Sequence, residues 1–162
     1  MKIHHTITIL GLTVMGAVGA SATAYAQSGH FIEGGSRAPD CDDVGTQVEC
    51  DGKVAGLGGT TFEVQVTAPG VAEVECENHG GNVAPGQDTS VNVAGTTGPQ
   101  PTPRNGQYTF TLVTADPEPL PAVPTCPNPL WTPHIVDVTF GVATLTLLED
   151  GVVVDTFTTP VD

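Results

Sequence analysis

The chain has 162 residues and is strongly acidic, with 18 Asp and Glu residues against 4 Lys and Arg residues and a formal net charge of −14. So few cationic side chains cannot neutralise phosphates, which excludes nucleic acid and anionic membrane surfaces as partners. The length predicts one domain, which buries roughly two-thirds of the surface that its unfolded chain exposes.

Residues 1–26 have the features of a removable signal peptide. A short positive start precedes an apolar run from Ile7 to about Ala20. That run is shorter than the roughly 20 residues that span a bilayer, which disfavours a membrane anchor. The sequence Ala24-Tyr25-Ala26 fits the A-x-A pattern that signal peptidase cleaves. We therefore expect residues 27–162 to be a single secreted domain, extracellular or at the cell surface, with no membrane contact after cleavage.

Four cysteines follow the cleavage site, and an even number outside the cytosol predicts disulfides. Three pairings are possible, of which we favour Cys41–Cys50 and Cys76–Cys126. The loop-entropy treatment gives about 2.7 kcal/mol for the short loop and about 4 kcal/mol for the long one. A zinc site is the rival interpretation, but the sequence lacks the CxxC pair typical of one.

The first clear strand pattern lies in Thr60–Thr67, where apolar and polar residues alternate. Ala68-Pro69-Gly70 then predicts a turn, and Val71–Glu77 alternates again. We expect these two segments to form a hairpin with a strongly acidic outer face. The residues expected to face inward are Phe62, Val64, Val66, Ala72, Val74 and Cys76, and those expected to face outward include Glu73, Glu75 and Glu77.

Shorter elements occupy the middle of the chain. Ser90–Val93 is a short strand candidate, and Asn105-Gly106 is a tight-turn dipeptide. Gln107–Thr114 alternates, and its predicted inner face consists of Tyr108, Phe110 and Leu112. The proline-rich segment 116–133 is expected to cross between sheets as an irregular connection.

The C-terminal part alternates from Ile135 to Leu148, with a predicted bulge near Gly141. The expected inner face there is Val136, Val138 and Phe140. Asp150-Gly151, between two apolar runs, is the strongest hairpin signal and predicts a turn into a last strand. Because helix signals are nearly absent, the pattern predicts an all-β fold, an immunoglobulin-like antiparallel β-sandwich of about seven or eight strands.

Trp131 is the only tryptophan of the chain and follows Cys126 closely. We expect it to pack near the Cys76–Cys126 bridge as part of the core. The alternative is a surface aromatic side chain that binds a ligand.

Several short motifs form a series along the chain. They are GKVAGLG at 52–58, CENHGGN at 76–82, APGQ at 84–87, NG at 105–106, CPN at 126–128 with Trp131, and DV at 137–138. The series resembles a group of bacterial exported proteins of uncharacterised function. The resemblance implies a secreted domain in which Cys76 and Cys126 belong to the shared pattern. It implies no activity and therefore transfers no catalytic residue.

Residue patterns for catalysis are sparse. The expected mature chain has three serines, Ser28, Ser36 and Ser90, and none lies in a G-x-S-x-G elbow. The even cysteine count argues against a catalytic thiol. We predict no catalytic, cofactor-binding or metal-binding residue and no enzymatic activity. The many carboxylates leave one alternative open, a carboxylate-dependent hydrolase of extracellular polymer.

A cluster of acids surrounds the predicted Cys41–Cys50 loop. Calcium prefers six to eight oxygen ligands, and a short disulfide loop could preorganise them, although the spacing does not match an EF-hand. A calcium-dependent adhesion module is therefore a second alternative. The acids are Asp40, Asp42, Asp43, Glu49 and Asp51. The three histidines of the mature chain would bind a metal only if the fold made them converge; they are His30, His79 and His134.

The leading hypothesis is a non-enzymatic secreted module with a structural, cell-surface or binding role and an unidentified protein or cell-surface partner. It needs no cofactor. Self-association is a variant, because residues 27–35 could extend and add a strand to the sheet edge of a neighbouring copy. The other possibility is that this segment pairs within its own domain.

Overall fold

The structure is a computed structural model that describes residues 28–162. The predicted signal peptide therefore lies outside the described residues. Within 28–162 no helix has the length and apolarity that crossing a bilayer requires. The described chain forms strands β1 to β11 and one short helix, α1 (Ala122–Thr125).

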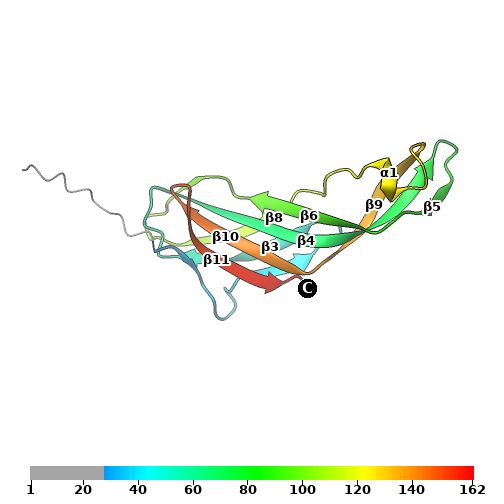
Figure 1. Cartoon of the computed structure of the whole chain (residues 1–162). Coiled ribbons are helices and arrows are strands. Elements are labelled where there is room, and N and C mark those ends of the chain that lie inside the picture. The colour runs from blue at the N-terminus through cyan, green and yellow to red at the C-terminus, as the bar shows by residue number, and fades with distance from the viewer. Residues whose placement is uncertain (1–27) are drawn as a thin grey trace, which may run out of the picture.

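Two antiparallel sheets form the fold, which confirms the all-β prediction (Figure 1). The four-stranded sheet consists of β1 (His30–Phe31), β2 (Asp40–Asp43), β3 (Val48–Ala55) and β8 (Tyr108–Val113). The seven-stranded sheet consists of β4 (Thr61–Asn78), β5 (Val83–Pro85), β6 (Thr89–Thr96), β7 (Gln100–Pro101), β9 (Trp131–Phe140), β10 (Val142–Glu149) and β11 (Val152–Pro160).

Strand β4 is the spine of the seven-stranded sheet and runs for 18 residues. One of its edges pairs with β10 and then with β9, and the other pairs with β7, β6 and β5 in turn. The hairpin predicted at Ala68-Pro69-Gly70 is therefore wrong. The alternation keeps its phase across Pro69, since Ala68 and Ala72 are both buried, and an unbroken phase indicates one continuous strand.

The core lies between the two sheets and is built from their alternating inward residues. Phe31 meets Phe110 edge to face, with ring centroids 6.1 Å apart, and Phe62 packs on Tyr108 at 4.8 Å. Phe110 and Leu112 are buried and Tyr108 is half-buried, which confirms the predicted inner face of Gln107–Thr114. Such aromatic pairs add to the free energy that burial of their area supplies.

The bulge in β9 lies earlier than predicted. The pairing of β4 with β9 shifts register between Glu73 and Val74, whose partners are Asp137 and Ile135. Val136 is thus the extra residue and is 45% exposed, so its predicted place on the inner face is wrong. Val138 and Phe140 are buried as expected. A bulge makes two residues oppose one, which changes the face of every residue beyond it.

The turn between β10 and β11 confirms the Asp-Gly prediction. Asp150 has φ 48° and Gly151 has φ 79°. Two successive residues with positive φ are what a type I′ turn requires, because its twist matches that of the flanking strands.

The described part of segment 27–35 pairs within its own domain. His30 and Phe31 pair with Ala55 and Val54 of β3. Phe31 is 2% exposed, and its backbone N–H donates to Asp155 Oδ2 at 2.8 Å. The structure therefore does not extend this strand towards a neighbouring copy.

Both disulfides have the pairing favoured from the sequence, Cys41–Cys50 and Cys76–Cys126. The first joins directly opposed residues of β2 and β3, so the predicted short acidic loop is a β-hairpin. The second joins β4 to the residue that follows α1. Disulfides of this kind form and persist in oxidising compartments.

Candidate functional site

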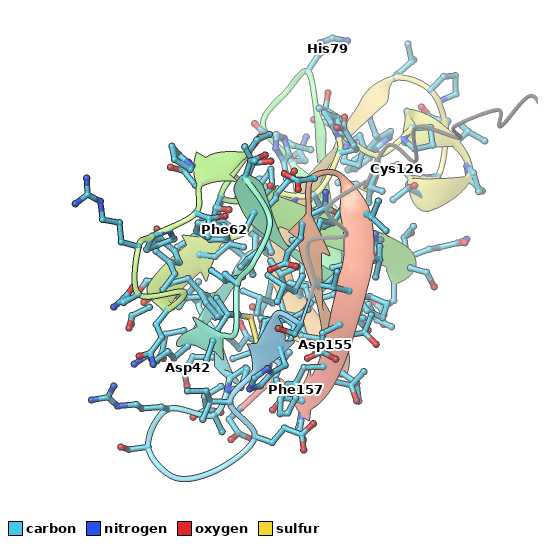
Figure 2. The ribbon with its side chains drawn as sticks, turned by 90° about the vertical axis from the view of Figure 1, so that its left-hand side faces the viewer. Asp42, Phe62, His79, Cys126, Asp155 and Phe157 are labelled. Carbon is cyan, nitrogen blue, oxygen red and sulfur yellow. A yellow bond between two sulfur atoms is a disulfide. The ribbon has the colours of Figure 1, made fainter. Side chains whose placement is uncertain are left out.

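The distal part of the β4–β9 ladder, with β5 and α1, lies at one end of the molecule beyond the four-stranded sheet (Figure 1). This part, residues 70–87 and 116–140, is hereafter the arm. In the view of Figure 2, His79 points away from the body in the upper part of the molecule, where Cys126 also lies, whereas Asp42 and Phe157 lie in the lower part. The arm is the part of the described chain that projects furthest from the sandwich core.

The inner face of the arm is covered by the proline-rich connection between β8 and β9. The backbone N–H of Gln87 donates to the carbonyl of Thr125 at 2.9 Å, and Cys126 is bonded to Cys76. Leu120 packs against buried residues of the core cluster. The predicted crossover connection is thus also the second layer that buries one face of the arm.

Trp131 begins β9 opposite Asn78 and is half-buried. It does not belong to the buried core cluster, so its predicted place in the core is wrong. Trp131 lies outside the core because it is at the end of the arm, where the connecting chain covers the β4–β9 ladder on one face.

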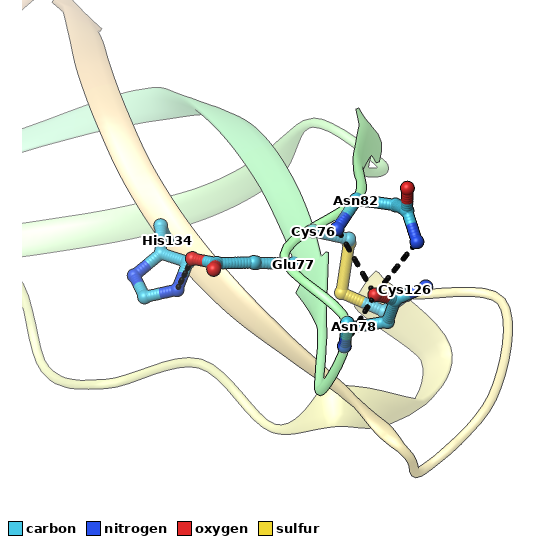
Figure 3. A network of polar contacts seen from close by, with 7 residues as sticks. Cys76, Glu77, Asn78, Asn82, Cys126 and His134 are labelled. Atoms are coloured by element: carbon cyan, nitrogen blue, oxygen red, sulfur yellow. Dashed lines mark hydrogen bonds and ion pairs between the residues drawn. A yellow bond between two sulfur atoms is a disulfide. The ribbon is translucent and has the colours of Figure 1, made fainter.

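The tip of the arm is a tight turn organised by Asn78. Its Oδ1 accepts hydrogen bonds from the backbone N–H groups of Gly80 at 2.9 Å and Asn82 at 3.0 Å, and from Asn82 Nδ2 at 3.2 Å (Figure 3). Gly81 has φ 77°, a conformation that glycine adopts at low cost. The CENHGGN motif therefore has a structural role, which is to hold His79 at an exposed apex.

A recess of about 320 Å³ lies beside this turn, and five polar residues line it. They are Glu77, Asn78, His79, Thr132 and His134. The Nε2 atom of His134 lies 3.7 Å from Oε2 of Glu77, and both side chains are about half exposed (Figure 3). His79 and His134 share this recess, whereas His30 contacts the Ser28 carbonyl on the four-stranded sheet's side.

Among residues 28–162, no group of three or more His, Cys, Asp or Glu side chains is placed to hold a metal ion. The acids near Cys41 and Cys50 do not converge on a point where calcium could bind, because strand alternation spreads them over the outer face of the sheet. Asp40 is opposite Asp51, and Asp42 is opposite Glu49. Asp43 instead closes the hairpin turn, where its Oδ1 accepts from the Gly45 N–H at 2.8 Å. Flat cross-strand rows do not surround a cation as a loop does.

Within residues 28–162, no second layer of chain covers the outer face of the arm, and the side chains of this face form cross-strand rows. Glu77 is flanked by Val83 and Thr132, and Glu75 by Pro85 and His134. A further row pairs Glu73 with Asp137. Directly opposed like charges destabilise a sheet, so the Glu73–Asp137 pair does not stabilise the fold.

Two carboxylates have clearly lowered pKa values. Hydrogen bonds from Thr96 and then Gln65 lower the pKa of Glu63. The Thr60 hydroxyl, followed by the backbone N–H groups of Thr61 and Thr60, lowers the pKa of Asp150 to about 2. A general acid in glycoside hydrolysis needs a raised pKa, and these two shifts have the opposite sign.

Asp150 should make stability depend on pH. Because its folded pKa of about 2 lies below its ordinary value of 3.8, its contribution is complete above about pH 4 and is lost as the pH falls towards 2. The difference in free energy of unfolding between wild type and Asp150→Asn, measured with urea, should therefore shrink over that window. Asp88→Asn serves as a control that removes an exposed charge elsewhere. A difference that stays constant from pH 6 to pH 2 would contradict this prediction.

Comparison with known proteins adds no assignment. The chain matches no family model, and no curated protein and no solved structure is significantly similar to it.

Proposed function

We propose that this protein is an exported, non-enzymatic binding module that acts at the cell surface or in the medium and recognises its partner with the arm. The observation that carries the proposal is the arm itself. It projects from the sandwich, is fixed by the Cys76–Cys126 bridge, and leaves its outer face and tip uncovered.

The strand order supports an immunoglobulin-like sandwich as the scaffold. The chain passes from β3 to β4, pairs β4 with β6, crosses to β8, and returns to place β10 between β4 and β11. The sets β2-β3-β8 and β11-β10-β4-β6 correspond to the A-B-E and G-F-C-C′ strands of that fold. The fold hosts many binding functions, so the site and not the scaffold must identify the partner.

Export is supported by two features. They are the cleavable signal pattern in 1–26 and the two disulfides. Under this proposal the mature domain meets its partner in an oxidising environment.

Exposed apolar side chains at the end of the arm support binding over a purely structural role. Leu130 is 67% exposed and Val83 is 58% exposed, although neither contributes to the buried core. Contiguous exposed apolar patches mark interaction sites, and under this proposal Leu130 and Val83 contribute to one at the end of the arm.

The test is capture of partners from the surface and medium of the producing cell, with the mature chain as bait. Wild type and a variant that combines Val83→Ser with Leu130→Ser should differ, because the second lacks the apolar groups of the arm. We expect the partner to be retained by wild type and lost by the variant.

The matched control combines Val152→Ser with Val153→Ser, two valines that are each 55% exposed in β11. It removes two comparably exposed apolar side chains from the other end of the molecule and should capture the partner as wild type does. Capture that is unchanged by the arm variant, or equally reduced by the control, would overturn the proposal.

A further inference from the structure

We infer that the outer face of the arm is a docking surface for a lysine- or arginine-rich polypeptide segment that also carries apolar side chains. This inference rests on the proposed function and specifies the chemical class of the partner. An apolar recess at the base of the arm, the charges beside it and the distribution of charge over the whole chain support it.

A recess of about 400 Å³ lies where β4, β6 and β9 meet. Its lining is mainly apolar and includes Pro69, Val71, Val91, Thr139 and Phe140. Val71 is 49% exposed although it lies mid-strand, with a partner strand on each side. The recess can therefore accept an apolar side chain from outside the molecule.

The acidic rows continue from this recess along the same face of β4. Val71, Glu73, Glu75 and Glu77 have the same phase in the strand, so all four side chains point outward. Asp137 adds a carboxylate opposite Glu73. At about 3.3 Å per residue, the face from Val71 to Glu77 is roughly 20 Å long, which matches a short extended segment with an apolar anchor at one end and cations beyond it.

Charge complementarity decides the occupant. The arm contains no Lys or Arg, since the basic residues of the described chain are Arg37, Lys53 and Arg104. The acidic face of β2 and β3 differs in this respect, because Arg37 and Lys53 line a recess together with Asp51. Lysine and arginine side chains of residues 28–162 thus lie beside the acids of the four-stranded sheet and not on the arm. On the arm, His134 lies 3.7 Å from Glu77, and His79 lines the same recess.

A second copy of the chain fits this face poorly. Two molecules that each carry a formal net charge of −14 repel one another, and approach of the two arms would bring like charges together. A foreign cationic segment instead relieves the repulsion between Glu73 and Asp137, and electrostatic attraction speeds its association.

The probe for the test is a fluorescently labelled peptide with a valine at one end and lysines at every second position beyond it, titrated with the mature protein and followed by fluorescence anisotropy. A peptide in which glutamate replaces lysine is the reference. The arm variant combines Glu73→Gln, Glu75→Gln and Asp137→Asn. It should bind the lysine peptide about tenfold more weakly than wild type, which is the effect of losing three exposed ion pairs.

The matched control combines Asp42→Asn, Glu49→Gln and Asp51→Asn, which removes the same charge from the four-stranded sheet. It should bind the lysine peptide within about twofold of wild type, because only generic attraction is lost. Val71→Ser should weaken binding without changing the net charge. Urea unfolding should show that all variants fold.

Several outcomes would overturn the inference. One is wild-type protein that does not prefer the lysine peptide to the glutamate peptide, and another is an equal loss in the arm and control variants. A dimer in size-exclusion chromatography that the arm variant abolishes would assign the face to a second copy instead. If the peptide test fails while Val83→Ser with Leu130→Ser still loses the cellular partner, the proposed function stands and only the cationic class is wrong.

Discussion

Replacing Cys76 and Cys126 together by alanine should lower the free energy of unfolding by about 4 kcal/mol. The bridge closes a loop with a sequence separation of 50, and a cross-link of that length restricts the unfolded chain by about this amount. It also ties the connection that covers the inner face of the arm to β4, because Thr125 and Cys126 are buried against that face. Urea denaturation of the mature domain measures the effect, and hydrogen exchange should show the largest loss of protection in β5 and α1.

The other disulfide provides the control for this prediction. Replacing Cys41 and Cys50 by alanine opens a loop with a sequence separation of 9, for which the same treatment gives about 2.7 kcal/mol. That variant should keep the protection of the arm and its capture of a partner. A greater loss of stability in the Cys41 and Cys50 variant than in the Cys76 and Cys126 variant would contradict the role of the long loop.

The sequence predicts most strands of the sandwich because one face of each strand is exposed to solvent, which produces an alternation of apolar and polar residues. Alternation in Thr60–Thr67 and Gln107–Thr114 places the buried residues correctly, and Asp150-Gly151 predicts the last hairpin. These signals are local: each depends on two or three neighbouring residues and on strand geometry.

The continuity of β4 could also have been predicted, but the local signal at Pro69-Gly70 favours a turn. Even-numbered residues remain inward on both sides of that dipeptide, whereas a two-residue turn reverses the chain. Phase over a long window is therefore the better criterion here than the composition of one dipeptide. The bulge at Val136 has no such signal, because its register is set by the partner strand β4.

Glu149 shows how a distant contact escapes sequence reasoning. It has the inward phase of Ala143, Leu145 and Leu147 and is fully buried, although it adjoins an exposed turn. Its Oε1 accepts a hydrogen bond from the Gly58 N–H at 2.8 Å, from a residue 91 positions away in the chain. A carboxylate is buried only where such donors exist, and one sequence does not reveal them.

The sequence predicts only some features of the arm. The acidic outer phase of Val71–Glu77 and the pairing of Cys76 with Cys126 follow from the sequence patterns. The recess at Val71 does not, because it forms where β6 and β9 flank the same stretch of β4. Which strands become neighbours depends on packing of the whole domain and not on the pattern of any one strand.

Gly70→Ala should destabilise the protein by about 1–3 kcal/mol, the range for extra methyl groups in well-packed sites. A Cβ at this position would lie 2.6 Å from Val138 Cγ1, 2.9 Å from Phe140 Cδ1 and 3.0 Å from the Thr139 carbonyl oxygen. Contacts this short force β9 away from β4, at the point where the arm leaves the sandwich. Thermal and urea unfolding measure the loss, and partner capture should fall with it because the recess beside Val71 is distorted.

Gly141→Ala is the matched control for this prediction. Gly141 lies between the end of β9 and the start of β10, next to the same β4–β9 ladder. A Cβ at this position would meet nothing within 4 Å. Alanine has less conformational freedom than glycine in the unfolded chain, so this substitution should leave stability unchanged or raise it by a few tenths of a kcal/mol, up to about 1 kcal/mol. If both alanine variants are equally destabilised, backbone freedom and not the close approach of β9 to Gly70 determines the effect, which would contradict this prediction.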